Sequence, residues 1–256
     1  MTLARHTWFM VVRQARNLMR EPIWIVMMII QPLIWLLLYG QLFSRVGSLR
    51  GSAGSYVEFL TPGIVCMNAY FGGTWAGMAM ITDLDRHVVD RFLASPASRV
   101  AVVLSQIVRA GITAIIQAFI LLLVGLALGV RVHGGAPGWL LVLGAAALLA
   151  MVFAGFSNGI ALLVRKEASM IATANFVGLP LMFLSSILIS NEAMPHWIEV
   201  ASRYNPVNWG VRAARNAVVT GGDWGPSGIY LALLVAAMIA TTAFATWSFR
   251  TYQRSL

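Results

Sequence analysis

The chain has 256 residues, of which 59% are hydrophobic and only 11% are charged, whereas about 25% of the residues of a typical soluble domain are charged. These values exclude a water-soluble globule, and in a membrane protein the net charge of +9 indicates orientation and lipid contact rather than nucleic-acid binding. A helix that crosses a bilayer needs about 20 mostly apolar residues, and six stretches meet this requirement. They cover residues 22–43, 58–81, 101–128, 139–163, 169–190 and 228–249.

These six spans predict an all-α membrane protein. The chain has no internal repeat and no hydrophilic linker that would divide it, so we expect one membrane domain over residues 1–256. Residues 1–20 are amphipathic, because their four arginines fall on one helical face and Trp8 lies on the opposite, apolar face. This pattern is typical of an interfacial helix in the headgroup layer. A helix packed against a neighbouring soluble subunit would show the same pattern, and both interpretations can hold together.

Residues 82–99 join the second and third spans and are rich in charge. The pattern predicts a short helix over residues 83–94 that ends before Pro96. A solvated loop between two spans is the simplest interpretation of such a segment, and only its detailed sequence, considered below, indicates more.

The third span carries a polar stripe at spacings of three, four and four residues. The stripe consists of Gln106, Arg109, Thr113 and Gln117. Such spacing places the four side chains on one face of a helix. The stripe is either the polar wall of a transport pathway or a helix contact, including a contact with a second copy of the chain. In the alternative interpretation, residues 101–109 still lie at the interface and Arg109 extends to the headgroups.

Residues 191–226, between the fifth and sixth spans, are too apolar for a free loop and contain no stretch long enough to cross a bilayer. Pro195 suits the first turn of a helix, and Asn205 with Pro206 interrupts the helical pattern. We therefore expect two short helices that enter the outer leaflet as a re-entrant region. The run GGDWGPSG, residues 221–228, predicts a turn into the last span.

An even number of spans places both termini on one side of the membrane. If that side is the cytoplasm, the inner segments hold eleven basic residues and the outer segments hold six, in agreement with the positive-inside rule. Seventeen of the eighteen basic residues are arginine, a bias that suggests a GC-rich bacterial genome. We therefore expect a multi-pass protein of a bacterial cytoplasmic membrane with both termini inside.

The spans lack the groups that ion-coupled transporters and enzymes use. All nine acidic residues and all four histidines lie at span ends or in loops, whereas gradient-driven transporters place such groups inside the bilayer. The chain has one cysteine, Cys66, and no HExxH, GxSxG or GxxxxGK[ST] motif. The sequence thus predicts no catalytic, metal-binding or cofactor-binding residue, and any uphill transport must draw its energy from another chain.

Two motifs resemble those of the type-2 family of ATP-binding-cassette (ABC) export permeases, in particular the daunorubicin-resistance-like drug exporters. An acidic and Arg-rich stretch that ends in Ser/Thr-Pro-x-Ser-Arg joins spans two and three of that family. It corresponds to Asp85, Arg86, Asp90, Arg91, Ser95, Pro96, Ser98 and Arg99. A Pro-Trp helix, an Asn-Pro pair and a short helix with an arginine follow span five in the family. They correspond to Pro195, Trp197, Asn205, Pro206 and Arg215.

The resemblance implies a transport subunit that is not itself an enzyme. Two copies would form the membrane pathway, and each would bind a separate ATPase subunit that holds ATP and Mg²⁺. Residues 82–99 would be the coupling segment, and an amphipathic drug or lipid-like compound would be the substrate. Glycolipid or polysaccharide export remains open within the family, and a scaffold or channel remains open outside it. The chain departs from the family at Ser186 and Ser190, where Gly and Pro are usual, at His87, where Gly is usual, and at Arg212, which is often acidic.

Overall fold

The computed structural model describes residues 22–44, 53–85, 99–221 and 224–253. Throughout these ranges the regular structure is helical. The long helices are α2 (Pro22–Leu42), α3 (Tyr56–Thr74), α4 (Ala76–Asp85), α6 (Arg99–Ala127), α7 (Gly135–Val164), α8 (Glu167–Phe183) and α11 (Trp224–Gln253). Four short elements separate α8 from α11. They are η2 (Asn191–Ala193), α9 (His196–Arg203), α10 (Pro206–Arg215) and the π-helical turn η3 (Asn216–Thr220).

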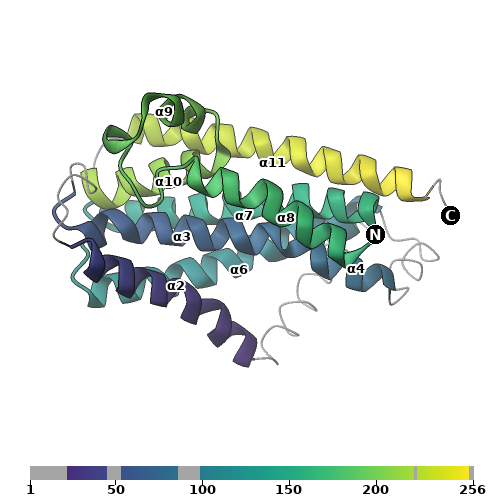
Figure 1. Cartoon of the computed structure of the whole chain (residues 1–256), viewed down its shortest axis with the longest axis horizontal. Helices are drawn as coiled ribbons and strands as arrows, with labels where there is room; N and C mark the ends of the chain where they lie inside the picture. Colours follow the sequence, from purple (N-terminus) through teal and green to yellow (C-terminus); the bar gives the residue numbers. More distant parts are fainter. Residues whose placement is uncertain (1–21, 45–52, 86–98, 222–223, 254–256) are drawn as a thin grey trace.

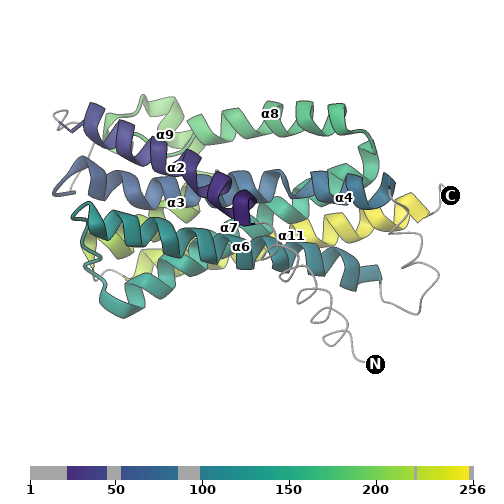
Figure 2. The ribbon, with the colours of Figure 1, turned by 90° about the horizontal axis from the view of Figure 1, so that it is seen from below.

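The long helices form a bundle around α7, which packs against α3, α4, α6, α10 and α11 (Figure 1). The helices α2, α3 with α4, α6, α7, α8 and α11 run in alternating directions along the long axis of the molecule (Figures 1 and 2). One end, which we call the α9 end, holds α9, α10 and the turn between α6 and α7. The opposite end, which we call the Lys166 end, holds the turn between α7 and α8 and the last turn of α11 (Figure 2).

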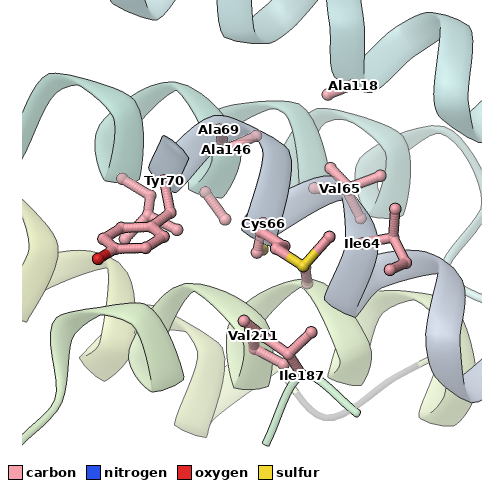
Figure 3. Packing of buried hydrophobic residues seen from close by; sticks show 14 of the residues in the cluster. Ile64, Val65, Cys66, Ala69, Tyr70, Ala118, Ala146, Ile187 and Val211 are labelled. Carbon is pink, nitrogen blue, oxygen red and sulfur yellow. The ribbon is translucent and has the colours of Figure 1, made fainter. Parts of the chain in front are cut away.

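The buried side chains form two clusters that divide the bundle along its length. The first cluster includes the α3 residues Ile64, Cys66 and Tyr70, which contact side chains of α6, α7 and α10 and Ile187 (Figure 3). The second cluster lies nearer the Lys166 end and gathers residues of α4, α6, α7, α8 and α11. The side chains on the outside of the bundle are also apolar. Leu140, for example, is 72% exposed and Phe176 is 82% exposed. Such an exposed apolar surface suits lipid rather than water.

Four helical stretches are long and apolar enough to cross a membrane, and they are Tyr56–Asp85, Val103–Ala127, Gly135–Val164 and Trp224–Tyr252. They confirm the second, third, fourth and sixth predicted spans as membrane-length elements. The apolar stretches in α2 and α8, Ile29–Leu42 and Glu167–Phe183, are shorter. The prediction of a helix up to residue 190 was wrong, because α8 ends at Phe183 and residues 184–190 are not helical.

Two further boundaries differ from the expectation. The second span is not one continuous helix, because α3 ends at Thr74 and α4 begins at Ala76, with Trp75 between them. The predicted turn over residues 221–228 is shorter than expected, because α11 already begins at Trp224. Proline at the third position of α11 is compatible with helix, since the first turn has no internal partner for its N–H groups. The predicted interfacial helix, residues 1–20, lies outside the described residues.

Candidate functional site

Of the predicted coupling residues, two fall within the described helices. Asp85 is the last residue of α4 and is exposed, and Arg99 is the first residue of α6. Both helix ends lie at the Lys166 end of the bundle (Figure 2). The other predicted coupling residues are outside the described ranges. They are Arg86, Asp90, Arg91, Ser95 and Pro96.

The polar stripe of α6 contacts the second span of the same chain. The amide of Gln106 donates to Asp83 Oδ2 of α4 at 3.0 Å, and its oxygen accepts from Arg109 Nε at 3.2 Å. Further along the same face of α6, Gln117 Oε1 accepts from Asn68 Nδ2 of α3 at 3.0 Å. Gln106 and Gln117 are buried. Two members of the stripe therefore make hydrogen bonds between helices, which hold polar groups inside an apolar bundle. Thr113 is half-buried in the same row.

Arg215, the last residue of α10, contacts two distant parts of the chain. Its guanidinium donates to Phe59 O of α3 at 3.3 Å, to Ser186 O at 2.7 Å and to Ser186 Oγ at 3.2 Å. It also lies over the ring of Phe59, 3.7 Å from the centroid. The planar fork of arginine suits such divergent acceptors, whereas a lysine ammonium is a point charge. Arg215 thus joins α10 to α3 and to the non-helical stretch 184–190.

Asn205 and Asn208 bind that stretch from the start of α10. Asn205 Oδ1 accepts from Val207 N at 2.9 Å and caps α10, while its Nδ2 donates to Leu181 O at 2.7 Å and Leu184 O at 2.8 Å. Asn208 Oδ1 accepts from both the backbone and the hydroxyl of Ser186. We call residues 184–190 together with Asn205, Asn208 and Arg215 the outer clamp. Non-helical backbone is tolerated at membrane depth only where protein groups satisfy it in this way.

The remaining residues of the predicted outer motif have separate positions. Pro195 is the N-cap of α9, Trp197 is 67% exposed, and Pro206 occupies the first turn of α10. Arg203 Nη2 donates to Glu199 Oε1 at 2.8 Å on the exposed face of α9. This hydrogen bond lowers the pKa of the Glu199 carboxyl below its usual value. Pro195 and Trp197 therefore do not join the outer clamp.

The α9 end contains further contacts that sequence reasoning did not anticipate. The backbone N–H groups of His133 and Gly134 donate to Val218 O and Ala217 O of η3, and His133 Nδ1 lies 3.3 Å from Glu58 Oε1 of α3. Arg212 Nη1 donates to Tyr230 Oη of α11 at 2.9 Å. Arg212 and Arg215 stand three residues apart on α10, and both are held by neutral oxygens. In the described part of the chain no three His, Cys, Asp or Glu side chains gather to form a metal site.

Sequence reasoning identified Asn205 and Arg215 but missed their partners. Ser186 and Asn208 carry no spacing signal of their own, although Ser186 had stood out as a departure from the usual glycine. Ser157 of α7, buried between α3 and α4, also escaped notice, because one serine in an apolar span is an ordinary residue. The role of a polar residue that binds a helix break cannot be predicted from the sequence until the position of the break is known.

Apolar side chains outside the bundle and paired polar groups inside it define a multi-pass helical membrane protein. The model of the ABC-2 type transporter family matches residues 5–219. The chain therefore belongs to this family.

Relatives extend along most of the chain. It is 27% identical over 238 residues to the daunorubicin resistance ABC transporter permease protein DrrB1 of Streptomyces coeruleorubidus, covering 91% of this chain and 80% of the relative. It is 29% identical over 204 residues to the ycf38 protein of Cyanophora paradoxa, described as a transport permease, covering 78% and 69% of the two chains. The ycf38 protein of Porphyra purpurea is 25% identical over 210 residues, with 80% and 70% covered. These relatives are transport permeases, and none of them is described as an enzyme.

Proposed function

We propose that this chain is the membrane-spanning subunit of an ATP-driven exporter that moves an amphipathic drug or lipid-like compound out of the cell. The observation that carries the proposal is the similarity to a daunorubicin resistance permease over 91% of the chain. Membership of the ABC-2 family supports a separate ATPase subunit as the source of energy. In this proposal two copies of the chain form the pathway, and each copy binds one ATPase subunit with its ATP and Mg²⁺.

Six crossings are part of the proposal. The alternating directions of α2, α3 with α4, α6, α7, α8 and α11 support this count (Figure 1). The fifth crossing is a helix of 17 residues that rises about 25 Å, and the non-helical stretch 184–190 lengthens it. In this arrangement α9 and α10 are the re-entrant elements, and the outer clamp satisfies the backbone between them and α8.

The proposed orientation places the Lys166 end in the cytoplasm of a bacterial cell and the α9 end outside. Three of the four described arginines of the α9 end support it, because Arg203, Arg212 and Arg215 are engaged by side-chain or backbone oxygens, while Arg131 is exposed. Lys166 and Arg250 at the Lys166 end are exposed to the surroundings. Basic residues available to anionic headgroups are expected on the cytoplasmic face.

The proposal is tested by purifying the tagged chain from its host and reconstituting the complex in vesicles. We expect an ATPase subunit to co-purify and vanadate-sensitive hydrolysis to depend on this chain. We also expect ATP-dependent accumulation of fluorescent daunorubicin in vesicles whose cytoplasmic face points outward. A panel of amphipathic compounds that stimulate hydrolysis would then identify the substrate. A chain that purifies without any ATPase would contradict the proposal and favour a scaffold or channel.

The coupling segment is tested in the same preparation. We expect Arg91→Ala to lower hydrolysis and daunorubicin uptake at least about fivefold while membrane insertion stays intact, because lost contacts to a charged group cost about 1.5–3 kcal/mol. Pro96→Ala should lower both as well, because proline fixes the backbone angle φ at its position. Arg131→Ala, an exposed arginine in the turn between α6 and α7, is the matched control and should keep full activity. Transport that is unchanged in both coupling variants would contradict the coupling role of residues 82–99.

A further inference from the structure

The second span is interrupted at Trp75, and one side chain of another helix occupies the interruption. In a continuous α-helix the N–H of Gly77 would bond to Gly73 O, and Thr74 O would accept the N–H of Met78. Instead, Gly77 N donates to Ser157 Oγ of α7 at 2.9 Å, and the same hydroxyl donates to Thr74 O at 2.5 Å. Met78 N turns to Trp75 O at 3.1 Å. A hydroxyl inserted into the ladder is a recognised cause of a helix kink.

The residue types around the break permit this insertion. A Cβ atom on Gly77 would lie 2.5 Å from Ser157 Oγ and 2.6 Å from Ser157 O, so only glycine allows α7 to approach so closely. Ser157 is buried, with a relative exposure of 1%. Its hydroxyl therefore satisfies a donor and an acceptor that would otherwise be unpaired in an apolar environment, where each unpaired group is costly.

The two halves of the span belong to different packing units. The buried residues of α3 belong to the first core cluster, and Ala76, Met80 and Ile81 of α4 belong to the second. Gln106 of α6 binds Asp83, so the lower part of α4 is tied to the start of α6. Met170 of α8 also reaches the break, because a Cβ atom on Gly77 would lie 3.0 Å from its Cε. The break thus lies between two cores.

We infer that the break at Trp75 is a joint on which α4, together with the start of α6, tilts relative to α3. The hydroxyl of Ser157 is the positioning group that holds this joint in its present bend. Because α4 and α6 both lead into residues 86–98, displacement of that segment reaches the membrane core through this joint. This role in transport rests on the proposed function, whereas the joint itself rests on the contacts of Ser157.

A distance between spin labels on the two halves of the span tests the joint. Gly72 of α3 and Asp85 of α4 are exposed and lie thirteen residues apart, about 20 Å along a helix. Both are changed to cysteine in a Cys66→Ala background, and the chain is measured in vesicles without nucleotide. We expect Ser157→Ala to broaden the distance distribution and Gly77→Ala to shift its maximum.

Two control variants separate the joint from general loosening. Ser248→Ala removes a buried serine hydroxyl of α11 that has no hydrogen-bond partner among the described residues, and Gly144→Ala adds a methyl group where no atom lies within 4 Å. Both should keep the narrow distribution of the parent protein. If Ser157→Ala is as narrow as the parent, or broadens no more than Ser248→Ala, the positioning role of Ser157 is overturned.

A second arm connects the joint to the ATPase. In the reconstituted complex, trapping with ATP and vanadate should shift the 72–85 distance, and Ser157→Ala should lower daunorubicin transported per ATP hydrolysed at least about threefold. An unchanged distance in a complex whose hydrolysis vanadate inhibits would overturn the role of the joint while the proposed function stands. Absence of vanadate-sensitive hydrolysis would overturn the proposed function, and the nucleotide-free distances would still decide whether Ser157 holds the joint.

Discussion

At the α9 end, Arg212 and Arg215 are structural cross-links rather than free surface charges, whereas Arg131 is exposed. Arg215 has no acidic partner among the described residues, and its hydrogen bonds go to Phe59 O, Ser186 and Ile187 O. An arginine stays charged in proteins, so backbone oxygens and the face of the Phe59 ring must stabilise the charge. Arg215 is therefore not available to lipid headgroups, and its position does not count against the proposed orientation.

Arg215→Lys is expected to destabilise the protein although it keeps the charge. A lysine ammonium cannot reach Phe59 O and the two oxygens of Ser186 in the same geometry, and the loss of charge-assisted bonds costs about 2 kcal/mol. Thermal unfolding of the purified chain in detergent measures the change. Arg203→Lys is the control, because Arg203 is exposed and makes one bond to Glu199 that lysine can keep. Equal unfolding temperatures for the two variants would contradict the role assigned to Arg215.

At the scale of elements, the approach of the 184–190 stretch to α3 depends on one glycine. A Cβ atom on Gly63 would lie 2.5 Å from Ile187 O. The obstructing atom belongs to the backbone, so no side-chain rotation can relieve the contact. Tyr56 Oη of the same helix donates to Leu188 O at 3.0 Å, one residue further on. Helix α3 thus packs against the outer clamp at Gly63 and binds it through the Tyr56 hydroxyl.

Gly63→Ala is therefore expected to lower stability by about 1–3 kcal/mol, the usual cost of an overpacked site. The same unfolding measurement checks it. Gly72→Ala in the same helix is the matched control, because no atom lies within 4 Å of its added methyl group; it should leave stability unchanged or raise it by about 0.5–1 kcal/mol. If both variants unfold alike, the 184–190 stretch does not depend on close packing at Gly63.

Sequence patterns predicted the helices well and their interruptions poorly. Hydropathy located α6, α7 and α11 within a few residues, because long apolar runs in a bilayer can only be helical. It continued the fifth span to residue 190, because residues 185–190 are still apolar on average, whereas Asn205 and Arg215 stabilise a non-helical backbone there. It also continued the second span through Trp75, because no residue near Trp75 in the sequence indicates that the Ser157 hydroxyl replaces a hydrogen bond of the helix backbone. In both places the deciding partner lies far away in the sequence.

At the scale of the whole molecule, the two ends of the bundle differ in how tightly the helices are joined to one another. At the α9 end, the outer clamp and the contacts of His133 and Gly134 with η3 fasten α3, α6, α7 and α10 to one another. Toward the Lys166 end the second core cluster is smaller, and the second span is broken above it. In the proposed orientation, the end with more contacts between helices faces outward and the interrupted span leads toward the cytoplasm.

The orientation of the bundle can be tested with single cysteines at the two ends of α7. This helix has 30 residues and is about 45 Å long, enough to cross a hydrocarbon core of about 30 Å. Arg131→Cys and Lys166→Cys place thiols at exposed positions near its start and its end, while native Cys66 is buried and gives the background. A membrane-impermeant maleimide should label position 131 in intact bacterial cells and position 166 only after permeabilisation, because the proposed orientation puts the α9 end outside. The reverse pattern would invert the orientation, and labelling of both positions in intact cells would contradict a crossing by α7.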